Sequence, residues 1–233
     1  MEEFSRTEML FGKDAVAKLG AKRVIVFGVG GVGGYVCEAL ARSGVGTIDI
    51  VDNDTVALSN INRQIIALHS TVGKYKVDVM ETRLKDINPN IAVNSYKTFY
   101  TKETSNEFDF SKYDYIVDAI DTVSGKIELA VKASASGTPI ISSMGAGNKT
   151  EPCMFKVSDI YKTSVCPLAR VMRSELKKRG IKSLKVVYSE EPPKTPSSKP
   201  DCGAKKVPPA SCAFIPSAVG LIAASEVIKD LMD

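Results

Sequence analysis

The sequence predicts an α/β fold of the Rossmann-like kind, a mainly parallel sheet flanked by helices. Three observations support this prediction: short β-branched runs alternate with helical patterns, a glycine-rich turn joins the first run to the helix after it, and acidic residues follow several of the runs. Strands that alternate with helices of this length form βαβ units, whose strands are parallel.

The elements up to about residue 150 follow one another in a regular alternation. Apolar spacing predicts a first helix over residues 3–19. Later helices end at a glycine or before a proline, which stop a helix; they are expected at 35–44, 74–88 and 124–137. The continuous apolar runs of a buried parallel sheet are expected as strands at 22–29, 47–52, 91–96, 114–120 and 138–145.

The alternation changes beyond residue 150, where we expect a C-terminal extension of strands and helices. Strands are predicted at 153–160 and 184–190, and helices at 167–180 and 213–231. Between them, residues 190–209 hold six prolines, so this stretch is expected to be an exposed, mobile loop. We interpret residues 1–233 as one domain, with a nucleotide-binding core (1–150) and a C-terminal part (151–233).

Composition excludes several classes of protein. The 233 residues are 44% hydrophobic and 25% charged, as in a globular domain. No apolar run approaches the roughly 18 residues of a membrane span, and the acidic, polar beginning is unlike a secretory signal. Five cysteines without a Cys-x-x-Cys pair, and one histidine, fit neither a disulfide framework, a zinc site nor a histidine-based triad. We expect a cytoplasmic protein without zinc and without a membrane.

A phosphate-binding turn is the first functional motif. Gly28, Gly30 and Gly33 form Gly-x-Gly-x-x-Gly between an expected strand and helix, and Gly31 lies within the same turn. Such glycines permit a tight turn and a close approach of the backbone to phosphate at the helix N-terminus. Asp52 ends the next strand, where a carboxylate can accept from a ribose hydroxyl. The motif predicts a nucleotide but does not separate NAD from ATP.

Charged and amide side chains after the strands favour ATP. Arg63 and Lys76 supply the two cations that attack at an α-phosphorus requires, because charge builds on the leaving pyrophosphate. Asp121 follows the fourth strand and suits Mg²⁺, which takes one or two carboxylates and completes its shell with phosphate and water. The remaining polar residues expected in the same crevice are Asp54, Asn60 and Gln64.

These motifs resemble the ThiF/MoeB/HesA superfamily, which includes the adenylation domains of ubiquitin-activating enzymes. The resemblance rests on GVGGVGGYVCEALARSG, DNDTVALSNINRQ, VGKYKVDV and DAID, in the order of that family. It implies that the glycine turn and Asp52 hold ATP, that Asn60, Arg63 and Lys76 grip its phosphates, and that Asp121 binds Mg²⁺. Arg6 matches an arginine that the family lends to a neighbouring subunit, which implies a homodimer.

The C-terminal part resembles the branch of the tRNA threonylcarbamoyladenosine dehydratases (TcdA, or CsdL). That branch uses ATP to activate the side-chain carboxylate of threonylcarbamoyladenosine at position 37 of tRNA; the carbamoyl group of the same side chain then displaces AMP. The resemblance thus implies tRNA as a partner, and sulfur-transfer proteins as possible partners. Adenylation of the C-terminus of a ubiquitin-like sulfur carrier is the alternative, and an NAD-dependent dehydrogenase is a third hypothesis.

Positive charge is concentrated in residues 162–206, which hold 12 Lys and Arg against 4 Asp and Glu. The rest of the chain holds 19 against 23, from totals of 31 and 27. A basic segment on an acidic body favours a polyanionic partner, although the solvated face of an amphipathic helix gives the same pattern. The residues expected to meet tRNA phosphates are Arg170, Arg173, Lys177, Lys178, Arg179, Lys182 and Lys185.

One position departs from the dehydratase branch. Cys166 stands before Pro167 where that branch is expected to carry an acidic residue. Cys202 and Cys212 flank the proline- and lysine-rich loop, and we expect them to be structural or incidental rather than to carry sulfur.

Overall fold

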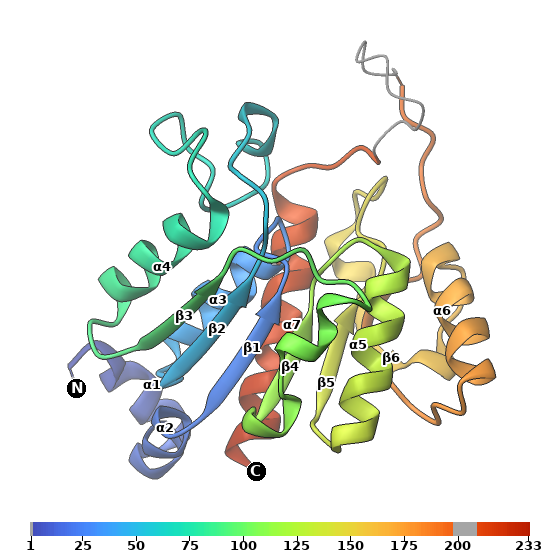
Figure 1. Cartoon of the computed structure of the whole chain (residues 1–233). Coiled ribbons are helices and arrows are strands. Elements are labelled where there is room, and N and C mark those ends of the chain that lie inside the picture. Colours follow the sequence, from blue (N-terminus) through green and yellow to red (C-terminus); the bar gives the residue numbers. More distant parts are fainter. Residues whose placement is uncertain (1, 198–208) are drawn as a thin grey trace.

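A seven-stranded sheet lies at the centre of the computed structural model, which describes residues 2–197 and 209–233 (Figure 1). The strand order is β3-β2-β1-β4-β5-β7-β6; neighbouring strands from β3 to β7 are parallel, and β6 pairs antiparallel with β7. The mainly parallel, Rossmann-like sheet is therefore confirmed. In chain order the strands are β1 (Arg23–Phe27), β2 (Thr47–Val51), β3 (Ala92–Tyr96), β4 (Tyr115–Asp118), β5 (Ile140–Ser143), β6 (Phe155–Asp159) and β7 (Lys185–Ser189).

Helices cover both faces of this sheet. In Figure 1, α3 and α7 lie behind the sheet and α5 lies in front of it, with α6 at the β6 side. The helices are α1 (Ser5–Phe11), α2 (Lys13–Gly20), α3 (Gly33–Arg42), α4 (Lys76–Ile87), α5 (Val123–Ser136), α6 (Pro167–Lys178) and α7 (Phe214–Met232). Short 3-10 turns are found at Glu2–Phe4, Leu58–Asn60, Thr104–Glu107, Phe110–Lys112, Pro152–Met154 and Ile160–Lys162.

Strand β1 shows why the apolar runs form the centre of the sheet. Successive side chains of a strand point to opposite faces. Val24 and Val26 accordingly belong to the core that contains α3 and α7 residues, whereas Ile25 and Phe27 belong to a second core that contains Leu129 of α5. Burying such a side chain stabilises the fold by about 1.5–3 kcal/mol, so a strand that is apolar on both faces after Arg23 is stable only between two helical layers.

The expected helix over residues 3–19 is wrong in one respect. Two helices occupy this stretch, α1 and α2, and Gly12 separates them with a φ of 91°. A left-handed φ interrupts a right-handed helix, and glycine adopts it at little cost. The other strands and helices that the sequence predicts are found within a few residues of their expected bounds.

The C-terminal helix α7 packs against the nucleotide-binding half of the chain. At Gly220 a side-chain Cβ would lie 2.5 Å from the carbonyl oxygen of Val32, in the loop that leads into α3. The absence of a side chain therefore lets α7 approach that loop closely. No helix in the described part of the chain is long and apolar enough to cross a bilayer. The expected mobile loop at 190–209 falls mostly outside the described residues, as does Cys202.

Candidate active site

A cavity of about 750 Å³ opens at the carboxyl ends of β1, β2, β4 and β5. Its volume is typical of small-molecule sites, which measure about 300–1,000 Å³. In an open parallel sheet, ligands bind at this edge. The lining includes every residue predicted to bind ATP except Gly33, namely Gly28, Gly30, Gly31, Asp52, Asp54, Asn60, Arg63, Gln64, Lys76 and Asp121.

The glycine turn has no room for side chains. Gly28 has a φ of 89°, and a Cβ there would lie 2.8 Å from the carbonyl oxygen of Ala119. Gly33 begins α3 and lies directly beneath the turn, where a Cβ would lie 1.8 Å from the carbonyl oxygen of Gly28. Both positions therefore require glycine. The turn leaves the N-terminus of α3 beside the cavity, and such a helix end attracts phosphate.

Asp52 joins the end of β2 to the glycine turn. Its carboxylate accepts hydrogen bonds from the backbone amides of Val29, at 2.7 Å, and Asp54, at 2.9 Å. Burial raises the pKa of this carboxyl above its ordinary value, while the nearby Lys76 ammonium and the two amides oppose the increase. These contacts hold Asp52 at the rim of the cavity, where a ribose hydroxyl can reach it.

Two cations line the cavity, Arg63 from the segment between β2 and α4 and Lys76 from the first residue of α4. The ammonium group of Lys76 lies 2.7 Å from a carboxylate oxygen of Asp54 and 3.9 Å from one of Asp52. Arg63 donates from Nη1 to the carbonyl oxygen of Ser59 and to the amide oxygen of Asn62, both at 2.9 Å. The guanidinium has further N–H groups, which remain available for a ligand.

Amide side chains complete this wall. Gln64 is only 7% exposed, yet its Oε1 atom has no hydrogen-bond partner among the described residues. A buried polar atom without a partner is costly, so a ligand or water that donates to this atom is favoured. Asn60 accepts a hydrogen bond from the amide of Ala57, which shapes the turn before Arg63. A nucleotide fits this lining, because it meets backbone amides, two cations and an unsatisfied amide oxygen.

Asp121 lines the same cavity from the loop between β4 and α5. Its carboxylate is exposed, lines the cavity, and forms no hydrogen bond or ion pair with the described residues. No group of three or more His, Cys, Asp or Glu side chains within residues 2–197 and 209–233 is placed to hold a metal ion by itself. A single free carboxylate fits Mg²⁺ that is held mainly by nucleotide phosphates and water.

Arg6 does not line the cavity of its own chain. It lies on the exposed side of α1. Figure 1 shows α1 beside the lower ends of the strands, away from the edge that forms the cavity.

The basic residues predicted to bind tRNA divide into two groups. Four of them already have partners within the chain. Arg173 donates to Thr163, and Lys178 and Arg179 form ion pairs with Glu175. The fourth, Lys185, is described below. The other three are exposed and form no hydrogen bond or ion pair with the described residues: Arg170, Lys177 and Lys182.

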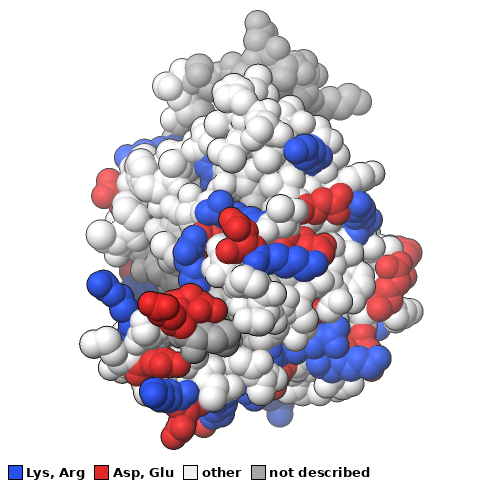
Figure 2. Space-filling view, turned by 90° about the vertical axis from the view of Figure 1, so that its left-hand side faces the viewer, with Lys and Arg blue, Asp and Glu red and all other residues white. Residues whose placement is uncertain are grey.

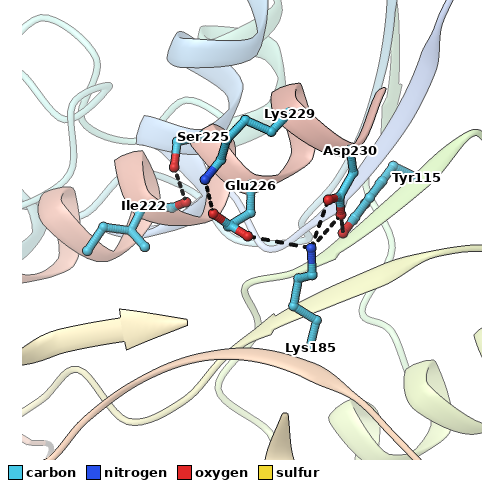
Figure 3. A network of polar contacts seen from close by, with 7 residues as sticks. All are labelled: Tyr115, Lys185, Ile222, Ser225, Glu226, Lys229 and Asp230. Carbon is cyan, nitrogen blue, oxygen red and sulfur yellow. Dashed lines mark hydrogen bonds and ion pairs between the residues drawn. The ribbon is translucent and has the colours of Figure 1, made fainter. Parts of the chain in front are cut away.

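Lys185 is held by two carboxylates of α7. Its ammonium group lies 2.6 Å from Asp230 and 3.5 Å from Glu226, and Tyr115 also donates to Asp230 at 2.6 Å (Figure 3). Lys185 begins β7, so it lies at the end of the sheet opposite the cavity. In this arrangement its charge ties β7 to α7.

The cavity contains residues that the sequence did not single out. Lys126 and Tyr100 line it although both are buried, at 1% and 3% exposure, and the Tyr100 hydroxyl has no hydrogen-bond partner among the described residues. The C-terminal part also contributes to the lining, through Leu168, Pro209, Ser211 and Pro216. Lys126 could have been found from the sequence because it lies in the first turn of the helix that follows a strand, and such a turn lies at the ligand edge of the sheet.

A comparison with family models decides the assignment. The model described as the ThiF family matches residues 4–233. The chain belongs to the ThiF family.

The similarity of this ThiF-family protein to known proteins covers its whole length. It is 45% identical over 242 residues to a tRNA threonylcarbamoyladenosine dehydratase of Bacillus subtilis, covering 100% of this chain and 95% of the relative. It is also similar to crystal structures of the Escherichia coli tRNA N6-threonylcarbamoyladenosine dehydratase, TcdA. The complex with AMP has a TM-score of 0.90 at 32% identity, and the complex with ATP has 0.90 at 31%; each match covers 99% of this chain and 94% of the other.

Proposed function

We propose that this protein is a tRNA threonylcarbamoyladenosine dehydratase, which uses ATP to adenylate the side-chain carboxylate of the modified adenosine at position 37 and then closes it into a ring. The observation that carries this proposal is that Arg63, Lys76 and Asp121 line one cavity together with the glycine turn. The full-length similarity to dehydratases supports the choice of substrate.

The residues of the cavity divide the work of adenylation. The amides of the glycine turn and the N-terminus of α3 receive the phosphates, and Asp52 accepts from the ribose. When the substrate carboxylate attacks the α-phosphorus, the bond to the bridging oxygen breaks and pyrophosphate leaves. Arg63 and Lys76 balance the charge that develops on the phosphates during this step. Gln64 presents its unpartnered Oε1 atom to a donor of the bound ligands.

We propose that Asp121 holds Mg²⁺ together with the phosphates of ATP. Bound there, Mg²⁺ supplies charge neutralisation of the triphosphate. The support is the exposed carboxylate of Asp121, which lines the cavity without a partner among the described residues.

Ring closure requires no nucleophile from the protein. The carbamoyl group belongs to the same side chain as the activated carboxyl carbon, so its effective concentration is high. It attacks that carbon, the acyl–oxygen bond to AMP breaks, and AMP leaves. Together the two steps remove the elements of one water from the nucleoside and convert one ATP into AMP and pyrophosphate. The chain's own contribution is to position the two ligands and to exclude bulk water.

We place tRNA on the α6 side of the cavity. Leu168 in the first turn of α6 lines the cavity, and Arg170 and Lys177 follow on the same helix, with Lys182 in the loop after it. These three cations have no partner among the described residues, so they are available to phosphates. Contacts of this kind provide affinity without reading sequence.

We also propose a homodimer in the cytoplasm. Three consecutive apolar side chains of α1 are exposed, Met9 at 86%, Leu10 at 74% and Phe11 at 44%, and Arg6 precedes them on the same helix. Figure 2 shows that the face carrying α4 is largely uncharged in its upper part, while Lys, Arg, Asp and Glu are intermixed below. A second copy that covers the exposed apolar side chains of α1 would bring its own Arg6 close to this chain. Sulfur-transfer proteins remain proposed partners on the basis of family resemblance.

Pyrophosphate release tests the substrate. Purified protein with Mg²⁺ and ATP is offered either tRNA that carries threonylcarbamoyladenosine, the same tRNA without this modification, or a ubiquitin-like sulfur carrier ending in Gly-Gly. We expect release with the modified tRNA alone. Release with the carrier and none with modified tRNA would replace this proposal by the sulfur-carrier alternative.

A further inference from the structure

A buried lysine lies at the floor of the cavity. Lys126 is in the first turn of α5, is 1% exposed and donates to a carboxylate oxygen of Asp118 at 2.9 Å. It also lines the cavity that contains the glycine turn. Lysine is almost never fully buried unless it is paired, so the position of Lys126 depends on Asp118.

Asp118 connects three parts of the site. It is the last residue of β4 and is completely buried. Besides the bond from Lys126, its carboxylate accepts from the hydroxyl of Ser142 on β5, at 2.5 Å, and from the amide of Ile120, at 3.3 Å. Its carbonyl oxygen accepts from the hydroxyl of Ser143, at 3.3 Å. One carboxylate thus ties α5 and β5 to the loop that contains Asp121.

This loop is closely packed on both sides. A Cβ at Gly28 would lie 2.8 Å from the carbonyl oxygen of Ala119, and a Cβ at Gly125 would lie 2.7 Å from Cδ1 of Ile120. A shift of the loop would therefore press on the glycine turn or on the start of α5. The hydrogen bond from the Ile120 amide to the Asp118 carboxylate holds the loop where both neighbours have room for it, one residue before Asp121.

The charge of Lys126 also affects the site. Without Lys126, the carboxylate of Asp118 would be an unpaired buried anion, a state that is strongly unfavourable. It would also repel the phosphates of a nucleotide in the cavity or compete with Asp121 for a cation. The ammonium of Lys126 cancels this charge at 2.9 Å, which leaves Asp121 as the free carboxylate of the loop.

We infer that Lys126 is a positioning residue: by fixing and neutralising Asp118 it holds Asp121 where it can bind the Mg²⁺ of Mg²⁺·ATP. This inference rests on the nucleotide and Mg²⁺ sites of the proposed function and adds a residue to them. Groups that orient a metal ligand are known to change metal affinity by about 10–100-fold when they are replaced.

The test compares ATP binding in Mg²⁺ with ATP binding in a chelator, measured by calorimetry without tRNA. The ratio of the two dissociation constants reports the metal site, whereas a general loss of stability changes both constants. We expect Lys126→Met to lower the Mg²⁺-dependent enhancement by about 10–100-fold. Lys132→Met is the matched control, because Lys132 lies on the same helix, bonds Asn106 and does not line the cavity. Its ratio is expected to equal that of the wild type.

A double variant separates positioning from stability. Asp118→Asn with Lys126→Met leaves no unpaired charge, and replacing a buried ion pair in this way often restores stability. We expect its melting temperature to recover while the Mg²⁺-dependent ratio stays low, because the ionic anchor is still missing. A wild-type ratio in a folded Lys126→Met variant, or in the double variant, would overturn the inference. Wild-type protein that binds Mg²⁺·ATP but does not act on tRNA would instead overturn the proposed substrate.

Discussion

The ammonium group of Lys76 and the carboxylate of Asp54 lie 2.7 Å apart at the rim of the cavity. The two side chains are unequally buried: that of Lys76 is 7% exposed and that of Asp54 is 63% exposed. A bound phosphate could therefore replace Asp54 as the partner of Lys76, and the released carboxylate would return to water at little cost. In the proposed function, this pair would hold the Lys76 ammonium in place before ATP binds.

Replacing Lys76 should impair chemistry more than folding. For Lys76→Ala we expect kcat/KM for ATP to fall about 10²–10³-fold, the usual effect of losing one charge-stabilising donor. Steady-state pyrophosphate release measures it. Lys74→Ala is the control, since Lys74 is exposed and does not line this cavity. Equal activity of the two variants would remove Lys76 from the site.

Gly33 should not tolerate a methyl group. A Cβ there would lie 1.8 Å from the carbonyl oxygen of Gly28, so Gly33→Ala must displace the phosphate-binding turn. We expect a loss of about 1–3 kcal/mol in the free energy of unfolding, measured by denaturant titration, together with loss of ATP binding. Gly20→Ala should be neutral or slightly stabilising. Gly20 is the last residue of α2, and a Cβ there would lie 3.9 Å from its nearest atom, the carbonyl oxygen of Gly44. Unaltered ATP affinity in Gly33→Ala would contradict the assigned turn.

Asp121→Asn should impair turnover without destabilising the fold. The side chain is exposed and unpaired among the described residues, so the melting temperature should not change. Turnover should fall steeply, by about 10²-fold or more, because a metal ligand that stabilises the transition state is lost. Asp86→Asn, an exposed carboxylate on α4 outside this cavity, is the control. Near-wild-type turnover of Asp121→Asn at limiting Mg²⁺ would disprove the role.

Binding of tRNA should depend on the unpaired cations of the α6 side. Neutralising Arg170, Lys177 and Lys182 to Gln should reduce the slope of log affinity against log salt by about 2–3 units, measured by fluorescence anisotropy. Lys185→Gln should change the slope less than a single one of these substitutions, because its charge is already balanced by Asp230 and Glu226. An unchanged slope in the triple variant would place tRNA elsewhere.

The pKa of Asp52 predicts how ATP binding responds to acid. Because burial raises the pKa of this carboxyl, it takes up a proton at a higher pH than an ordinary aspartate. The ionised form is the one that accepts from Val29, Asp54 and a ribose, so affinity should fall as the pH decreases through this raised pKa. The difference in ATP binding energy between wild type and Asp52→Asn, measured by calorimetry, should therefore shrink on acidification. A constant difference would contradict this.

Local patterns predicted the sheet and most of the polar residues that line the cavity. The run from Arg23 to Phe27 has no polar side chain after its first residue, which leaves a strand between two helical layers as its stable location. The site residues Asp52, Lys76 and Asp121 could be found because each follows or precedes an element whose end lies at the ligand edge of a parallel sheet. Topology alone brings such ends together.

Contacts between distant segments could not be predicted in this way. Apolar spacing continues across Gly12, and nothing in the spacing shows that its φ is left-handed. The pairing of Lys185 with Asp230 joins residues 45 positions apart, so the sequence shows a cation without its partner. Lys126 has the opposite problem: its partner Asp118 is close in sequence, but its burial depends on how α5 packs against β4 and β5.

Mass spectrometry of the nucleoside at position 37 tests the central claim most directly. Modified tRNA is incubated with the protein, Mg²⁺ and ATP, digested gently and compared with a reaction that lacks ATP. If Arg63, Lys76 and Asp121 form one adenylation site, the nucleoside loses the mass of one water only when ATP is present, and one AMP is formed for each nucleoside converted. An unchanged nucleoside mass in a reaction whose protein binds Mg²⁺·ATP would contradict the dehydratase account.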